Sequence, residues 1–237
     1  MHYNQCGWKG VLALGADHPG FRYSDEETKS KLIAKLFVPI KKHGIASLRT
    51  DDIARYLDLS KATLYKYFES KDDIITSFVD LFISLFDMSS VLDETSGSYQ
   101  ERYQVVIRKM LVSANYGSDI FLRDLRALYP DLMERLHVAW LRRTEILREF
   151  YERGMDAGIF VRSNVELLIM QDELTLAKLS DPAALAARNL ACRQALTDYY
   201  RMRVHQIFVP GEMPNLEDEG TMGTLDMLAQ KITNSMM

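Results

Sequence analysis

Residues Lys61–Tyr67 bring ammonium, hydroxyl and phenol groups together on one segment with helical spacing. Leu64 and Phe68 lie four residues apart and would share the inward face of a helix. The side chains then expected to face outward are Lys61, Ala62, Thr63, Tyr65, Lys66 and Tyr67. Ammonium, hydroxyl and phenol groups bind phosphate oxygens and base edges, and the small Ala62 lets the backbone come close. The segment therefore predicts contact with a nucleic-acid duplex.

A second short helix is expected just before this segment. Thr50–Leu57 carries apolar residues on one face and acids in its first turn, where they favour the helix dipole. A tight turn at Asp58-Leu59 follows, and Ser60 is a good N-cap for the next helix. Two short helices joined in this way form a helix-turn-helix, whose second helix fits a major groove about 12 Å wide. A purely structural helical corner is the alternative interpretation.

Longer helices are expected on both sides of this motif. The first runs from Glu26 to Gly44, with Pro39 predicted to bend its last turn. The second runs from Lys71 to about Ser90 and has a broad apolar stripe. Together these elements predict a three-helix head at residues 25–71, preceded by an irregular arm at residues 1–24.

The remainder of the chain predicts further helices, with no strand alternation and no repeat. Their expected ranges are Tyr99–Tyr116, Asp119–Tyr129, Asp131–Ala157, Asn164–Leu179, Ala183–Phe208 and a weak Thr224–Asn234, with an acidic loop at Leu216–Gly220. The predicted fold class is all-α: the N-terminal helix-turn-helix head is followed by a larger helical bundle at residues 72–209 and a tail at residues 210–237.

The charge distribution separates the head from the bundle. Residues 25–71 carry ten Lys/Arg against seven Asp/Glu, whereas residues 72–237 carry 17 against 25, within a total net charge of −4. A basic module on an acidic remainder predicts that one end of the chain meets a polyanion.

Several classes of protein lose support from the sequence. The longest nearly apolar stretch is Phe78–Phe86, nine residues, whereas a membrane-spanning helix needs roughly 20. Cys6 and Cys192 form no C-x-x-C pair, and no secretory signal is recognisable, so a reducing cytoplasm is expected. We expect no membrane association and no cofactor.

Catalytic and metal-binding readings are weaker than a binding role. Glu134-x-x-His137 has the spacing of half a helical di-metal site, but no second such pair occurs, and a surface helix pair is the better interpretation. No G-x-S-x-G elbow, Walker or Rossmann glycine pattern is present. We expect no metal and no enzymatic activity. A helical enzyme or small-molecule-binding protein with a non-functional helix-turn-helix remains the alternative.

The motif residues also resemble a known family. Asp51-Asp52-Ile53-Ala54, Leu59-Ser60-Lys61-x-Thr63-Leu64-Tyr65-x-Tyr67-Phe68 and Ser70-Lys71-Asp72-Asp73-Ile74 are similar, without gaps, to the N-terminal DNA-binding domain of TetR-family transcriptional regulators. The similarity covers about residues 28–76. Arg153-Gly154 to Phe160 also looks like a turn common in that family. Where the family usually has Gly, this chain has Asp58, a residue that tolerates a left-handed backbone.

The resemblance implies roles for individual residues. Lys61, Ala62 and Tyr65 would face base edges. The residues that would contact phosphates are Thr50, Thr63, Lys66, Tyr67 and Lys71. Ser60, at the helix start, completes the DNA-binding set. The resemblance also implies a dimer that binds a pseudo-palindromic double-stranded DNA operator, and a ligand-responsive, repressor-like regulator.

A pocket for a small-molecule effector is implied within residues 99–180. Aromatic residues of the middle helices would suit such a pocket, although each alone is more simply explained as core. They are Tyr103, Tyr116, Phe121, Trp140, Phe150 and Tyr151. The resemblance places dimer formation on the last two long helices, Asn164–Leu179 and Ala183–Phe208. Packing within one chain is the alternative for their apolar stripes.

Overall fold

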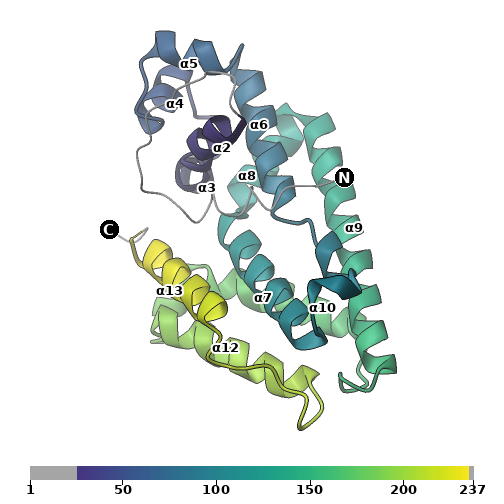
Figure 1. The fold of residues 1–237 in the computed structure, drawn as a ribbon. Helices are drawn as coiled ribbons and strands as arrows, with labels where there is room; N and C mark the ends of the chain where they lie inside the picture. The colour runs from purple at the N-terminus through teal and green to yellow at the C-terminus, as the bar shows by residue number, and fades with distance from the viewer. Residues whose placement is uncertain (1–25, 235–237) are drawn as a thin grey trace. The chain divides into compact units, whose positions relative to one another are not determined.

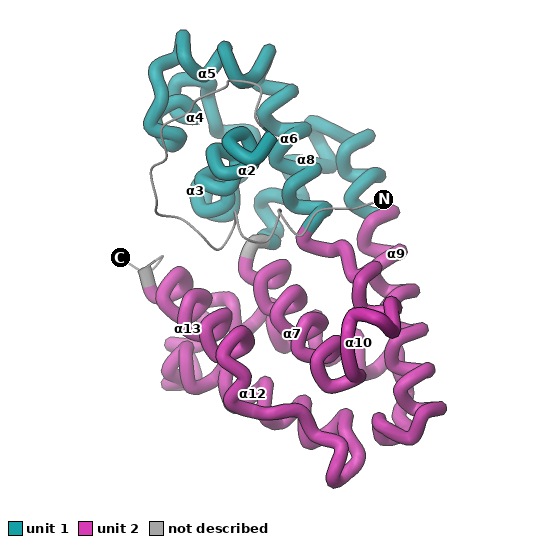
Figure 2. The backbone as a smooth tube through the Cα atoms, in the orientation of Figure 1, with its two compact units in different colours: residues 1–84, 116–137 teal, residues 85–115, 138–237 magenta. Residues whose placement is uncertain are grey.

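The computed structural model describes residues 26–234, which form helices and turns without any β-strand in that range (Figure 1). The predicted all-α fold class is confirmed, while the arm expected at residues 1–24 lies outside the described residues. The chain divides into two compact units (Figure 2). Unit 1 comprises Met1–Ser84 and Tyr116–His137, and unit 2 comprises Leu85–Asn115 and Val138–Met237.

Unit 1 contains the helix-turn-helix and the helices that support it. Its elements are α2 (Glu26–Ala34), α3 (Phe37–His43), α4 (Thr50–Tyr56), α5 (Lys61–Tyr67), α6 (Lys71–Ser84), α8 (Asp119–Leu128) and the start of α9 (Pro130–Asp156). Ile33, Phe37, Ile53, Leu64 and Phe78 are buried in its core. The unit therefore extends past residue 71, where the head was expected to end, and takes α8 from much later in the chain.

The first expected helix is two helices, so that prediction is corrected. The break falls at Lys35-Leu36, and Pro39 is the third residue of α3. Proline lacks the N–H that would donate to the carbonyl of Lys35, and its ring collides with that carbonyl. The helix therefore breaks one turn before the proline instead of bending at it.

Unit 2 is a bundle whose helices begin and end close to the expected residues. Its elements are α7 (Tyr99–Tyr116), most of α9, α10 (Val165–Leu179), α11 (Pro182–Ala186), α12 (Cys192–Ile207) and α13 (Glu219–Asn234), with short 3₁₀ turns at Ser89–Val91 and Glu94–Ser96. The ends of α7 to α10 agree with the sequence prediction within one residue. Side-chain caps mark two of these starts, since Ser118 and Asn164 each accept a backbone N–H at the beginning of α8 and α10.

Three helix boundaries were predicted wrongly. The helix from Lys71 ends at Ser84, not near Ser90. The expected helix Ala183–Phe208 is interrupted between α11 and α12, where Asn189 has a left-handed φ of 53°. The acidic loop expected at Leu216–Gly220 gives way to α13 at Glu219, because the carboxylate of Asp218 accepts the N–H of Thr221 and caps that helix.

The C-terminal segment is packed against the bundle. Leu225, Leu228 and Ile232 of α13 are buried, and α13 lies against α12. Residues 219–234 therefore belong to the body of unit 2 and do not form a loose tail.

One stretch passes a test for membrane spans by length and composition alone, namely Lys71–Val91, half of which is buried. The α-helix within it has 14 residues, fewer than the roughly 20 that cross a bilayer. Ile74, Ile75 and Phe78 pack inside unit 1, so the core of a helical protein accounts for the apolar character of this stretch.

Gly154 permits a close ring contact in unit 2. A Cβ atom at this position would lie 2.1 Å from the Phe160 ring. The N–H groups of Ile159 and Phe160 both donate to the Gly154 carbonyl, and Gly158 has a φ of 73°. The turn brings Phe160 onto Phe208, with ring centroids 5.0 Å apart.

Candidate nucleic-acid interface

The turn between α4 and α5 has the backbone expected at its central residue. Asp58 has a left-handed φ of 58°, which aspartate tolerates better than most residues. Its carboxylate is 2.8 Å from the Lys35 ammonium, and the N–H of Leu59 donates to the carbonyl of Ala54. These contacts fix the angle at which α5 leaves α4.

The start of α5 is held by side-chain hydrogen bonds. Ser60 accepts the N–H of Thr63 at 3.0 Å, and the two hydroxyls are 2.8 Å apart. The Lys61 ammonium lies 2.9 Å from the carboxylate of Asp51 on α4, and this hydrogen bond raises the pKa of Lys61. The lysine is therefore cationic at the N-terminal end of α5, where recognition helices contact base edges.

Most of the expected contact residues are accessible. Tyr65 is 48% exposed, Lys61, Ala62 and Lys66 are exposed, and Thr63 is half-buried. Outside α5, Ser60 is exposed, whereas Thr50 and Lys71 are half-buried. The outward face of α5 thus presents two ammonium groups and one phenol around a small residue.

Tyr67 was expected to face outward, but it is buried. It is 5% exposed, and its ring lies 6.3 Å from that of Phe68. Residues three and four apart share a helix face, so Leu64, Tyr67 and Phe68 form one inward stripe. The sequence prediction used only the spacing of four and left Tyr67 outside.

Lys71 points toward the protein backbone. Its ammonium is 3.4 Å from the carbonyl oxygen of Ile45. On its other side, the same peptide segment is held by Asp124 of α8, whose carboxylate accepts the N–H of Ile45 at 2.9 Å and of Ala46 at 3.0 Å. The turn that leads into α4 is therefore fixed by side chains from α6 and α8.

Asp124 is buried and ionised at this turn. Burial alone would raise its pKa, but the N–H groups of Ala46 and Ile45 and the Arg123 guanidinium outweigh it and lower the pKa. Gly44 has a φ of 74°, and a Cβ atom there would lie 2.2 Å from the Asp124 carboxylate. The sequence analysis did not identify Asp124, because its partners are nearly 80 residues away.

The expected effector-pocket residues are not gathered in one place. Phe121 belongs to unit 1, where its ring meets those of Phe78 and Phe82 edge-on. Trp140 is 37% exposed and donates to Glu173. Tyr103 and Phe150 are buried in unit 2, as is Tyr151. Tyr116 ends α7, and its side chain is outside the described set.

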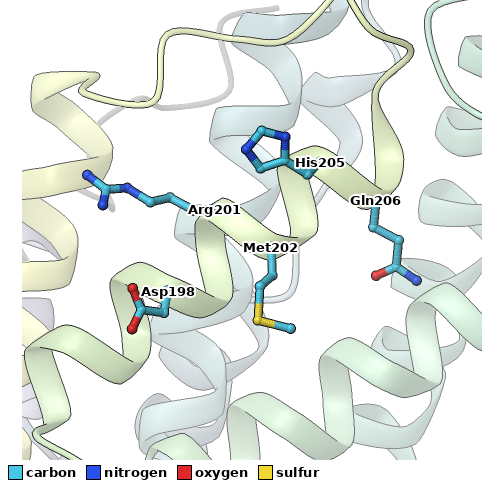
Figure 3. Close-up of a pocket in the computed structure, with 5 residues that line it drawn as sticks. All are labelled: Asp198, Arg201, Met202, His205 and Gln206. Carbon is cyan, nitrogen blue, oxygen red and sulfur yellow. The ribbon is translucent and has the colours of Figure 1, made fainter.

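A shallow pocket lies instead on the exposed side of α12 in unit 2 (Figure 3). It is lined by Asp198, Arg201, Met202, His205 and Gln206. All five residues come from one helix, and Met202 is 63% exposed. The pocket is a surface feature of that helix and includes none of the aromatic residues expected to bind an effector.

Residues 39–77 match the sequence model of the family described as "Bacterial regulatory proteins, tetR family". The helix-turn-helix segment of this chain is therefore similar to that of TetR-family regulators. The TetR match spans α3 to the first half of α6 and includes the whole helix-turn-helix. It also contains all of the residues expected to contact DNA.

Known proteins similar to this chain include transcriptional regulators. An uncharacterized HTH-type transcriptional regulator of Bacillus subtilis, YvaF, is 27% identical over 123 residues, which are 50% of this chain and 60% of that protein. A TetR-family regulator from Marinobacter aquaeolei has a TM-score of 0.53 at 20% identity, covering 86% of this chain and 98% of its own. A candidate regulator from Saccharomonospora viridis in complex with choline has a TM-score of 0.56 at 17% identity, covering 78% and 100%.

Among residues 26–234, no group of three or more His, Cys, Asp or Glu side chains is arranged to hold a metal ion.

Proposed function

We propose that this protein is a dimeric, DNA-binding transcriptional regulator of the TetR family and of the repressor type, controlled by a small molecule bound in unit 2. The observation that carries the proposal is the exposed set of Lys61, Tyr65 and Lys66 on a helix that Ser60 and Asp58 hold in place. Lys61 and Tyr65, with the small Ala62 between them, would face base edges. Thr50, Thr63, Lys66 and Lys71 would contact phosphates.

Selection of bound sequences from a random duplex pool tests this proposal directly. Specific binding that weakens steeply with added salt is expected, because each neutralised phosphate lowers the logarithm of the binding constant by about 0.9 per tenfold increase in salt. A helical enzyme or carrier with a non-functional motif would enrich no sequence and would show no such dependence.

Lys61→Ala and Tyr65→Ala are each expected to weaken operator binding by roughly 1–3 kcal/mol and to relax the sequence preference. The reason is that Lys61 begins α5 and Tyr65 is exposed one turn later, on the same face of that helix. Binding of each variant to the selected site and to scrambled duplexes measures both effects. Arg162→Ala, which removes an exposed cation of unit 2 outside α10 and α12, is the control. Unchanged specificity in both α5 variants would show that the assignment of groove residues is wrong.

The proposed dimer forms through α10 and α12. Among the apolar residues of these two helices, Leu168, Leu196 and Tyr200 are buried within the chain. Others remain on the surface: Leu167 is 56%, Met170 49% and Leu174 64% exposed, at helical spacing on α10. Met202 of α12 adds to the exposed apolar surface of these neighbouring helices. Asp198, Arg201 and His205 lie beside Met202 on α12, so polar groups border this apolar surface.

Leu174→Glu is therefore expected to convert the dimer to a monomer, because it would bury a carboxylate against an apolar partner surface. Light scattering coupled to size-exclusion chromatography measures the mass. Leu128→Glu, which changes a leucine of unit 1 that is 51% exposed, should leave the mass unchanged. A Leu174→Glu variant that stays dimeric at micromolar concentration would contradict this interface.

A further inference from the structure

Two consecutive acids in the first turn of α4 make different contacts. The Asp52 carboxylate accepts the N–H of Arg49 at 3.2 Å and pairs with the Arg55 guanidinium, so it holds the start of its own helix. Asp51 instead reaches toward α5, which packs against α4 (Figure 1). Its carboxylate is 2.9 Å from the Lys61 ammonium. Capping of α4 therefore accounts for Asp52 but not for Asp51.

The Asp51–Lys61 pair lies on the surface of the candidate nucleic-acid interface. The Asp51 side chain is 74% exposed and that of Lys61 is 54% exposed. An ion pair with this exposure contributes little to stability, because water screens it and two flexible side chains must adopt one geometry. The fold therefore does not depend on this pair, and both groups are accessible to a duplex that approaches α5.

A carboxylate at this position opposes binding to a polyanion. Each protein cation that reaches a phosphate releases counterions, and this strengthens binding to every sequence alike. Asp51 neutralises the Lys61 ammonium and holds it at ion-pair distance, so the lysine is less available to phosphates than an unpaired lysine would be. Asp51 therefore weakens the part of binding that does not depend on sequence.

The pair also presents one hydrogen-bond donor and one acceptor side by side. In a major groove, lysine donates to the O6 and N7 atoms of guanine, and aspartate accepts from the N4 amino group of cytosine. Lys61 is the first residue of α5, and the N-terminal residues of a recognition helix contact base edges. The two groups together complement the major-groove edges of a guanine and a cytosine.

We propose that Asp51 is a specificity-determining residue of the DNA interface. Its carboxylate holds the Lys61 ammonium away from phosphates and accepts a hydrogen bond from cytosine, while Lys61 donates to guanine. The inference rests on the proposed function, because it requires that α5 enter the major groove. It adds a base contact from α4, the first helix of the motif, to those assigned to α5.

Asp51→Ala should bind scrambled duplexes about eightfold more tightly at about 0.1 M salt, because the released Lys61 ammonium neutralises one more phosphate. The slope of the logarithm of the binding constant against the logarithm of salt should become steeper by about 0.9 for the same reason. The ratio of operator affinity to scrambled-duplex affinity should fall at least about fivefold, the lower end of what one good base contact contributes. Fluorescence anisotropy of labelled duplexes with the full chain measures all three quantities.

Glu27→Gln is the matched control. It also removes one carboxylate from an exposed ion pair of unit 1, since Glu27 lies 2.8 Å from the Lys31 ammonium on α2. Its ratio of operator to scrambled affinity should equal that of the wild type. Both variants should fold, with a Tm lowered by less than about 4 °C, because an exposed acid in a first helical turn contributes little. An equal fall of the ratio in both variants would overturn the assignment.

Asp51→Ala in a Lys61→Ala background separates the ion pair from the effect of charge alone. Without the lysine no ammonium is released, so the gain in scrambled-duplex binding should be much smaller than in the wild-type background. Equal gains in the two backgrounds would overturn the proposal, since Asp51 would then act only as a negative charge near the duplex.

Repeating the selection from a random duplex pool with Asp51→Ala tests the base contact. The wild-type consensus should contain a G·C pair that the variant no longer selects. An unchanged consensus would overturn this inference and leave the proposed function standing. Failure of the wild type to enrich any duplex would reject the proposed function and this inference with it, so the two failures are distinguishable.

Discussion

Replacing Arg203 by Met is expected to lower the free energy of unfolding by about 3–5 kcal/mol. The variant leaves the Asp172 carboxylate, 1% exposed, without its bidentate partner in the core of unit 2. Tyr199 is the remaining hydrogen-bond donor to that carboxylate among the described residues. Denaturant unfolding followed by circular dichroism measures the loss.

The double variant Arg203→Met/Asp172→Leu is the informative control. Replacing both members of a buried ion pair with apolar residues of similar size is often neutral or stabilising, so we expect it to regain most of the lost stability. The exposed pair Arg162–Asp156 provides a second comparison, since it lies on the surface and Arg162→Met should change stability by less than about 1 kcal/mol. Equal losses from Arg203→Met and Arg162→Met would contradict the role given to the buried pair.

Asp124→Ala is expected to destabilise unit 1 by about 2–4 kcal/mol, because it removes two charge-assisted hydrogen bonds and leaves buried N–H groups without an acceptor. Those N–H groups belong to Ile45 and Ala46, in the turn before α4. Operator affinity should also fall severalfold under conditions where the variant is folded, since this turn orients the helix-turn-helix. Asp119→Ala changes an exposed acid of the same helix and should affect neither property appreciably.

The contribution of Asp124 has a defined pH dependence. Its pKa in the folded protein lies below the ordinary value, which is about 3.9 in an unfolded chain. The stabilisation is therefore fully present above about pH 4 and is lost as the pH falls through the folded-state pKa. The difference in unfolding free energy between the wild type and Asp124→Ala should shrink in that acidic range. A difference that grows on acidification would contradict the hydrogen bonds assigned to this carboxylate.

The sequence predicted helices best where a local side chain marks their ends. The side-chain oxygens of Asn164 and Asp181 each accept a backbone N–H at the start of a helix. Each capping residue lies within three residues of the N–H that it binds. The interruption at Asn189 is different, because no glycine or proline marks it. The break at Lys35 was signalled by Pro39, but the prediction placed it at the proline itself.

The candidate sites were likewise predictable only where local sequence signals define them. The α5 face was predictable from periodicity, except that Tyr67 joins the inward stripe. The role of Asp124 depends on the N–H groups of Ile45 and Ala46, nearly 80 residues away, and a single sequence carries no information about such pairings. The choice of aromatic residues for a pocket was therefore insufficient, since Phe121 lies in the core of the other unit.

The route of the chain through unit 1 affects how this protein can be recombined with others. The polypeptide leaves the unit after Ser84 and returns at Tyr116 to contribute α8. A fragment cut at residue 84 would lose Phe121, which covers Phe78 and Phe82, and the carboxylate that holds Ile45. We expect such a fragment to aggregate or to remain partly unfolded. Transfer of the helix-turn-helix of unit 1 onto another helical bundle therefore requires residues 116–137 to be included.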